Sequence, residues 1–571
     1  MRIKLVGLIC IFVFLFLVSG LFSLGVIHHG KYKELSEKNC IRLIPQPGSR
    51  GKILSSEGDC IADNSLTYDI MLIPQETDLL RRSLKSLAAI LNIDLKEINA
   101  RFKAGYISPS MPVTIMKNVN SKKAIAVEES KAGINGVVIQ PAPLRTYPYG
   151  STAAHVIGYL AEIDHWRLTK LADYGYKTKD KVGFGGIEEK YDYYLQQEDG
   201  GLSVEVDRRG KVVRVIGFKP PQSGKDIQLT IELKLQRLVE EVLGGRNGCV
   251  VIMNPYSGGI LAMANGLDFD PGVFLDTSSR DEVKRIVTDK NALLLNRSIK
   301  GLYPPGSIFK CIVAAAALES GKLTPATTFV CQGSLVVGNN EFACWGKHGE
   351  EDLIQAIAHS CDVYFYKTGL LIGPQAIHDY SEKFGLAKPT TIELPYEAGG
   401  FIPSPLWKRL SRFKSWFDGD TANMAIGQGD VLVTPLQMVR MMAVFANQGK
   451  LVRPFIVKAI DGQDVSNYHR GSIELPFKKS TIDVVRRGLR AVVTDPEGTA
   501  GMLAALSVPV AGKTGTAEVA GKLSHGWFVG FFPFQTPRFV ICVFLENGGS
   551  GQAATGLAKE IIEKMAKENM I

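Results

Sequence analysis

The stretch Tyr303-Pro304-Pro305-Gly306-Ser307-Ile308-Phe309-Lys310 decides the fold of the C-terminal part of this chain. Its Pro-Pro-Gly turn runs into the apolar segment 311–318, which predicts a buried helix. Ser307 and Lys310 are spaced i and i+3, so on a helix they share one face. Ser307 would lie in the first turn, where backbone N–H groups are unpaired and the dipole favours negative charge. This arrangement suits acyl transfer through a covalent serine ester.

Two further motifs follow in the chain, Ser360-Cys361-Asp362 and Lys513-Thr514-Gly515-Thr516. A single S-x-x-K match is most simply a buried serine and an exposed lysine. Three motifs in this order, S-x-x-K, S-x-D and K-T-G, argue against coincidence, because together they supply a nucleophile, a base and an anion site.

The residues of the third motif suit a terminal carboxylate. Thr514 and Thr516 are alternate residues of a predicted strand, so both hydroxyls face one side. Lys513 adds a positive charge beside them, and Gly515 has no side chain to block an approaching substrate backbone. We therefore expect Thr514, Gly515 and Thr516 to bind substrate.

Length and composition indicate a globular protein of several domains. The chain has 571 residues, of which 45% are hydrophobic and 22% charged, which is enough for two to four domains with full cores. The formal net charge of +9 is spread along the sequence, without a long Lys/Arg block or a nucleic-acid motif. The basic balance favours work beside anionic membrane and wall surfaces, and no nucleic-acid partner is expected.

The N-terminus predicts a membrane anchor. The segment 5–27 carries no charged residue and would be about 34 Å long as a helix, enough to span a bilayer. Arg2 and Lys4 precede it, which predicts a cytoplasmic tip at residues 1–4 and export of the rest. A cleaved signal peptide is the alternative, but its apolar region is normally shorter and ends in an A-x-A-like site.

Two regions follow the anchor. Residues 28–225 alternate predicted strands and short helices, and contain no evident nucleophile–base pair, so they predict a non-catalytic pedestal. The turn-rich segment 220–224 marks a boundary, after which residues 226–571 form the predicted catalytic domain. Within it, the apolar runs 248–253 and 259–264 flank a turn and predict a hairpin central to a sheet.

The chain resembles the class B penicillin-binding proteins over nearly its full length. Besides the three motifs, the resemblance rests on Arg50-Gly51-x-Ile53, Gly183-x-x-Gly186-Ile187-Glu188-x-x-Tyr191, Met424–Gly429 and Thr434–Gln437. The S-x-D form of the second motif and the segment Trp345–Gly349 are similar to the elongation-specific branch, penicillin-binding protein 2. The sequence departs from that pattern in a shorter loop from Cys344 to His348, and in lacking the usual arginine in the strand after Arg50.

The resemblance implies a fold and a location. The expected fold is mixed α/β: a transmembrane helix, an extended α+β pedestal, and a serine β-lactamase-like transpeptidase domain. That domain would have a five-stranded antiparallel sheet flanked by helices, with the strand 513–517 in an inner position. The protein would be a single-pass protein of the inner membrane, with a periplasmic catalytic domain.

The resemblance also implies a D,D-transpeptidase that cross-links peptidoglycan stem peptides and is inhibited by β-lactams. Ser307 would attack the carbonyl between two terminal D-alanines, and Lys310 would take its proton. A free lysine has a pKa near 10.4, so burial or a nearby cation, for which Lys513 is the candidate, would have to depress it.

Other catalytic roles follow from the same resemblance. Ser360 would relay a proton to the leaving amine, and Asp362 would orient its loop. The amides of Ser307 and Thr516 would form the oxyanion hole. The chemistry requires no cofactor, and the expected partners are a SEDS-family glycosyltransferase and the elongation scaffold.

Other functions stay open at the level of sequence. A septal class B transpeptidase is the nearest alternative. A D,D-carboxypeptidase or a β-lactamase would use the same acyl-serine. A β-lactam sensor would normally carry cytoplasmic signalling sequence, which residues 1–4 do not provide.

Four residues have the composition of a metal site, in the pattern C-x12-C-x3-H-x12-C: Cys331, Cys344, His348 and Cys361. Four such ligands suit tetrahedral zinc, and Cys361 would tie the metal to the catalytic loop. The next interpretation is a Cys331–Cys344 disulfide, natural in an oxidising compartment, with His348 merely structural, and three unrelated core cysteines are the third. The spacing matches no standard zinc-finger template.

Overall fold

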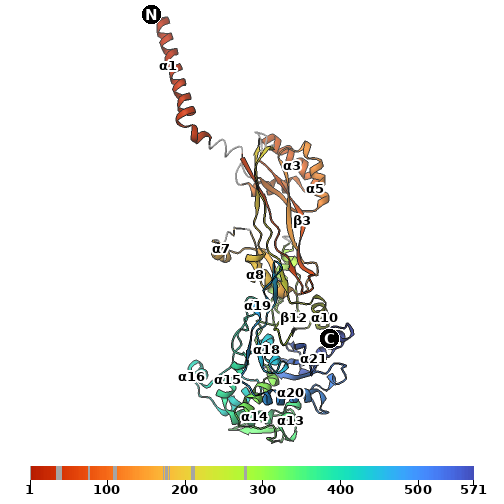
Figure 1. Cartoon of the computed structure of the whole chain (residues 1–571). Helices are drawn as coiled ribbons and strands as arrows, with labels where there is room; N and C mark the ends of the chain where they lie inside the picture. The colour runs from red at the N-terminus through yellow and green to blue at the C-terminus, as the bar shows by residue number, and fades with distance from the viewer. Residues whose placement is uncertain are drawn as a thin grey trace. The chain divides into compact units, whose positions relative to one another are not determined.

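A computed structural model of the chain describes residues 2–33, 41–74, 77–106, 112–171, 173, 176, 178, 180–206, 212–275 and 279–571. The chain divides into two compact units, each built from separated segments (Figure 1). The first unit comprises residues 1–51, 64–146 and 196–225, and the second comprises residues 52–63, 147–195 and 226–571. Each unit is described by itself below.

The N-terminal helix α1 (Arg2–Phe22) continues into a π-helical turn, η1 (Ser23–Ile27). The segment Lys4–Ile27 has a mean hydropathy of 2.9 over its most apolar window, and none of that window is buried against the protein. Its length and composition are those of a membrane span, in agreement with the predicted anchor.

The rest of the first unit is strands with a helical layer. One antiparallel sheet has the order β1 (Ile41–Gln46), β8 (Gly200–Val206), β9 (Val212–Lys219). The strand β3 (Cys60–Leu72) pairs with β4 (Val113–Val119) and β5 (Val137–Thr146). The helices α3 (Thr77–Leu91), α4 (Leu95–Gly105) and α5 (Ser121–Glu129) bury an apolar stripe, including Leu84, Leu87 and Leu91, against residues of β3 and β4.

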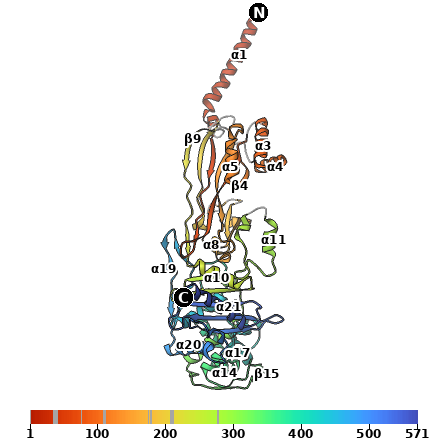
Figure 2. The same ribbon diagram turned by 90° about the vertical axis from the view of Figure 1, so that its right-hand side faces the viewer.

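The second unit is organised around a five-stranded antiparallel sheet (Figure 2). Its strand order is β12 (Ile260–Asn265), β11 (Gly248–Met253), β23 (Phe539–Leu545), β22 (His525–Phe532), β21 (Ala511–Ala517). All residues of β11, β22 and β23 are buried. Helices α10 (Leu233–Leu243) and α21 (Gly551–Lys567) cover one face, while α18 (Pro435–Ala446) and α20 (Lys479–Thr494) pack on the other. Burial on both faces explains the continuous apolar runs of these strands.

This architecture confirms the predicted fold class but corrects two strand positions. The predicted hairpin 248–264 forms, yet β12 is the first strand of the order and therefore not central. The strand β21, which carries Lys513 to Ala517, is the last strand and not an inner one. Only an edge strand leaves backbone N–H and C=O groups unpaired on one side, where an extended peptide can reach them.

Further helices complete the second unit beside and below this sheet. The turn η5 (Gly306–Phe309) runs into α12 (Lys310–Glu319), which packs against α14 (Asp362–Ile372). The second unit also contains the helices α11 (Arg280–Thr288), α13 (Leu353–Ala358), α15 (Pro374–Lys383), α16 (Pro405–Arg412) and α17 (Asp418–Ala425). A small hairpin is formed by β14 (Ser334–Val337) and β15 (Asn340–Ala343).

Candidate active site

The turn η5 sets the geometry of the first motif. It is a 3₁₀ turn, in which three residues complete one turn, so side chains at i and i+3 eclipse. Ser307 is half-buried in this turn, and Lys310 follows directly above it as the first residue of α12. Gly306 has φ +55°, and a Cβ there would lie 2.6 Å from the carbonyl oxygen of Thr516. Glycine is therefore required where the turn meets β21.

Lys310 joins the first motif to the second. Its side chain is fully buried, and its Nζ lies 2.7 Å from Asp362 Oδ1, 2.7 Å from the Ser360 carbonyl oxygen and 3.3 Å from Ser360 Oγ. These three acceptors match the three donors of an ammonium group. The predicted relay serine and orienting aspartate thus both lie within hydrogen-bond reach of the predicted base.

Ser360 lies in the short connection between α13 and α14. Its φ is +57°, the left-handed conformation that costs a non-glycine residue roughly 1 kcal/mol or more. Asp362 is the first residue of α14, where the helix dipole favours a carboxylate. The strained serine and the helix start together place both side chains against Lys310.

The strand β21 brings the third motif beside the nucleophile turn. A Cβ on Gly515 would lie 3.0 Å from both the Pro305 carbonyl oxygen and Ile308 Cγ1, so the strand and the turn are in direct contact. Thr514 Oγ1 lies 2.7 Å from Thr499 Oγ1, and Thr516 Oγ1 accepts a hydrogen bond from the Gly551 amide at 3.1 Å. All three motifs therefore meet in one site.

Lys513 is the second buried amine of this site. It is fully buried, and its Nζ donates to the Thr514 carbonyl oxygen at 3.3 Å. Burial, followed by repulsion from the charge of Lys310, lowers the pKa of Lys513 to about 7. At neutral pH one of the two amines is therefore close to losing its proton.

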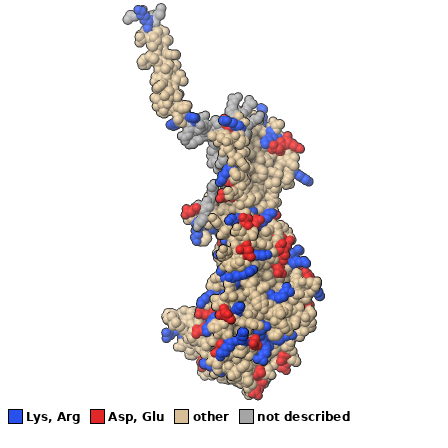
Figure 3. Space-filling model, in the orientation of Figure 1, with Lys and Arg blue, Asp and Glu red and all other residues tan. Residues whose placement is uncertain are grey.

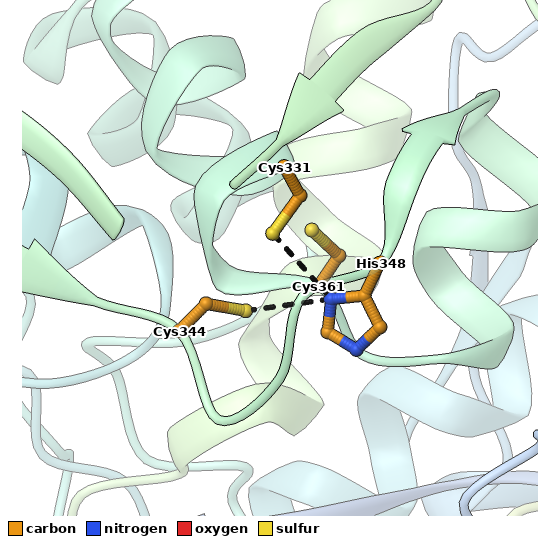
Figure 4. A group of neighbouring side chains, drawn as sticks. All are labelled: Cys331, Cys344, His348 and Cys361. Carbon is orange, nitrogen blue, oxygen red and sulfur yellow. Dashed lines mark hydrogen bonds between the residues drawn. The ribbon is translucent and has the colours of Figure 1, made fainter. Parts of the chain in front are cut away.

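The four predicted metal ligands converge at the start of α14 (Figure 4). One ligand atom from each of Cys331, Cys344, His348 and Cys361 lies within 4.8 Å of the other three. His348 Nδ1 is 3.6 Å from the sulfur atoms of both Cys331 and Cys344. All three cysteines are free thiols in this structure.

These distances fit a tetrahedral metal centre. With Zn–S bonds of about 2.3 Å and Zn–N bonds of about 2.0 Å, neighbouring ligands are separated by roughly 3.5 Å. Two sulfur atoms also accept backbone N–H groups, Cys344 Sγ from Asp362 at 3.2 Å and Cys361 Sγ from Tyr364 at 3.4 Å. A hydrogen bond from Cys361 is the largest cause that lowers the pKa of the Cys344 thiol, to about 5. The residues fit the metal, and the cluster is attached directly to the residue that bonds Lys310.

Several residues of the site lie outside the three sequence motifs. Thr499 meets Thr514 only through the fold, and the Gly427 carbonyl oxygen accepts the Gly306 amide at 3.0 Å. His359, next to Ser360, bonds Glu351 through Nδ1 and Asp495 through Nε2. The contacts of these residues form only in the folded chain, so neither spacing nor periodicity could have identified them.

Comparison with known protein families decides the identity of this site. The family model described as the penicillin-binding protein transpeptidase domain matches residues 248–566, which is more than half of the chain. The chain belongs to this family. The family model of the penicillin-binding protein dimerisation domain matches residues 45–229.

Individual relatives of this penicillin-binding protein support the elongation-specific resemblance. The peptidoglycan D,D-transpeptidase MrdA of Haemophilus influenzae is 32% identical, over 96% of this chain and 88% of that protein. A penicillin-binding protein 2 from Helicobacter pylori, solved in complex with MreC, has a TM-score of 0.83 at 25% identity, covering 93% of this chain and 99% of that one. A structure described as a peptidoglycan synthase complex that coordinates polymerisation and crosslinking has a TM-score of 0.75 at 30% identity, covering 99% of this chain and 98% of that one.

The contact between β21 and the nucleophile turn makes a prediction. In Gly515→Ala, the added methyl group would press on Pro305 and Ile308, so the strand must move away from Ser307. We expect acylation by a fluorescent penicillin to slow about tenfold or more, because small misplacements of reacting groups are costly. Gly556→Ala is the matched control, since a Cβ there meets nothing within 4 Å. Equal acylation rates in the two variants would contradict the prediction.

Proposed function

We propose that this chain is a peptidoglycan D,D-transpeptidase of the elongation type, acting through an acyl-serine intermediate. One observation carries the proposal. Lys310 Nζ is bonded to both Asp362 and Ser360, and Lys310 follows Ser307 by one 3₁₀ turn, so the amine and the relay form one connected group close to the nucleophile. The likeness to MrdA and to penicillin-binding protein 2 structures supports the elongation type over the septal alternative.

Acylation begins at Ser307. Its Oγ attacks the carbonyl carbon between the two terminal D-alanines, and its proton passes to an amine of the Lys310–Lys513 pair. The developing oxyanion accepts hydrogen bonds from the backbone amides of Ser307 and Thr516. When the C–N bond breaks, Ser360 passes a proton to the departing D-alanine amine. The amine of a second stem peptide then attacks the ester and releases Ser307.

The two buried amines act as a coupled pair. Because the pKa of Lys513 is lowered to about 7, the pair lacks one proton in a substantial fraction of molecules at neutral pH. A substrate carboxylate bound by Thr514 and Thr516 would favour the proton on Lys513. Lys310, one 3₁₀ turn from Ser307, is the member of the pair placed to take the proton of the serine.

The domain roles and the location follow from the same proposal. Residues 226–571 form the catalytic domain, residues 28–225 the pedestal, and residues 5–27 the single membrane anchor. With residues 1–4 in the cytoplasm, the catalytic domain is periplasmic. The H. pylori complex with MreC and the synthase complex support an elongation scaffold and a SEDS-family glycosyltransferase as partners.

We further propose a structural zinc ion held by Cys331, Cys344, His348 and Cys361. The ion would fix the connection that carries Ser360 and Asp362, and it would take no part in the acyl transfer itself. The mutual separations of the ligand atoms, all within 4.8 Å, support this over a single disulfide, which would leave His348 without a role.

The nucleophile is tested by intact mass after incubation of the full chain with a penicillin. We expect one stable adduct, absent from Ser307→Ala, because the ester persists where water is poorly activated. An adduct that decays within about seconds would indicate a β-lactamase. Release of D-alanine from a stem peptide without cross-linking would indicate a carboxypeptidase. Absence of any adduct in folded wild-type protein would refute the proposed function.

The amine pair predicts a pH dependence of acylation. Because the pKa of Lys513 is lowered to about 7, the neutral amine is present above this pH and is lost as pH falls below it. We expect the rate of acylation to fall about tenfold per pH unit below this value and to level off above it. A rate constant that stays flat over the roughly two pH units below the lowered pKa would contradict the coupled pair.

The metal proposal is tested by elemental analysis of the purified full chain. We expect about one zinc per chain, lost in Cys344→Ser together with a lower unfolding temperature. Cys60→Ser is the matched control, because its thiol donates to the Ala62 carbonyl oxygen outside the cluster. A zinc-free wild-type chain with a Cys331–Cys344 disulfide in its mass spectrum would refute the metal site.

A further inference from the structure

An apolar and basic projection lies beside the candidate active site. It comprises residues 401–417, namely helix α16 with the segments before and after it, and is called the α16 arm here. The arm is the projection at the lower left of the second unit in Figure 1, and in Figure 3 it is mostly tan with blue at its outer edge. Its sequence contains four Lys or Arg residues and no Asp or Glu.

The apolar side chains of the arm face solvent. Leu406, Leu410, Phe413 and Phe417 are 55%, 62%, 88% and 65% exposed. Leu406 and Leu410 lie one turn apart on α16, whereas Phe413 and Phe417 lie in the non-helical segment between α16 and α17. An exposed apolar patch of this kind marks an interaction site.

The basic residues divide into two pairs. Lys408 bonds Asp420 and Arg412 bonds Asp430, and these two cations also lie over the rings of Trp416 and Trp407 at 5.8 and 5.0 Å. These contacts hold the arm in shape.

Arg409 and Lys414 are exposed, and in the part of the chain that the structure describes neither makes an ion pair. Their charges are therefore available to an external anion.

Both ends of the arm region are attached to the nucleophile turn. Phe401 pairs with Leu432, and the next residue, Val433, pairs with Tyr303. After α17, the Gly427 carbonyl oxygen accepts the Gly306 amide at 3.0 Å. The segment 401–427, which contains the arm, is therefore connected at both ends to strands or turns that lie close to Ser307 in the folded chain.

We propose that the α16 arm binds the glycan strand and the acidic stem peptides of peptidoglycan outside the acyl-transfer site. This inference rests on the transpeptidase function proposed above. Pyranose rings present C–H faces that pack on exposed aromatic rings such as those of Phe413 and Phe417. Stem peptides carry at least a C-terminal carboxylate, which Arg409 and Lys414 can pair.

Two features favour this polymer over a lipid surface or a protein groove. The chain on either side of the arm is hydrogen-bonded near the turn that carries Ser307, and the polymer that bears the donor peptide has to lie close to that turn. Two of the four exposed apolar side chains are aromatic, and the exposed cations Arg409 and Lys414 belong to the same short segment, so the arm offers both kinds of contact to a polymer of sugars and carboxylates. Binding energy from such remote contacts lowers KM and positions the reacting peptide.

The test measures sedimentation of the full chain, in detergent, with purified peptidoglycan sacculi. One variant is Arg409→Glu with Lys414→Glu, and a second is Phe413→Ser with Phe417→Ser. The control is Lys284→Glu with Lys290→Glu, which reverses two exposed charges in and after α11. Acylation by a fluorescent penicillin, measured on the same samples, reports folding and the Ser307 site independently.

We expect the Kd for sacculi to rise about fivefold or more in both arm variants and to stay unchanged in the control variant. The rate of acylation by penicillin should be unchanged in all three variants. For the wild-type chain, added salt should weaken binding, and the charge-reversal variant should lose this dependence. Wild-type affinity in both arm variants would overturn the proposal and leave a membrane or a partner protein as the occupant. A wild-type chain that is never acylated would instead overturn the transpeptidase function, whatever the sacculus data show.

Discussion

The burial of two lysine amines in one site is the constraint on which the second unit depends. Lys310 and Lys513 are both fully buried, and an unpaired ammonium away from water costs several kcal/mol. Lys310 meets this cost with three acceptors, all supplied by Ser360 and Asp362. Lys513 has a lowered pKa instead, so it can lose its charge near neutral pH. The connection between α13 and α14 therefore has one permitted position relative to α12.

The same connection is held from its other side by sulfur. Cys344 Sγ accepts a hydrogen bond from the Asp362 amide, and Cys361 Sγ accepts one from the Tyr364 amide. The cysteine cluster therefore caps the N-terminus of α14, whose first residue is Asp362. Ser360 stays in its strained conformation only because its surroundings fix it on both sides. Lys310 supplies one of these restraints and the cysteine cluster supplies the other. Asp362 contacts both, so this one residue links the cluster to Lys310.

How much the sequence could predict depends on whether the information is local. The spacing of Ser307 and Lys310 is local, because both residues belong to one turn. That the three motifs meet was predicted from their order, which matches a known signature, and the cysteine–histidine cluster was predicted from the ligand types in C-x12-C-x3-H-x12-C. Strand order is not local: the alternation in Lys513 to Ala517 fits an inner or an edge strand equally, and β21 is at the edge. Contacts such as Thr499 with Thr514 exist only after the sheet and helices have packed.

The position of β21 at the edge links substrate binding to the amine pair. An extended peptide that pairs with the free side of β21 would bring its C-terminal carboxylate to the face of Thr514 and Thr516. A negative charge there stabilises the protonated form of Lys513, whose pKa is otherwise lowered by burial and by Lys310. The charge of Lys513 therefore depends on whether a substrate carboxylate is bound. Under the proposed mechanism the protonation of the amine pair would thus respond to substrate binding, and an inner strand, with both sides paired, could not produce this coupling.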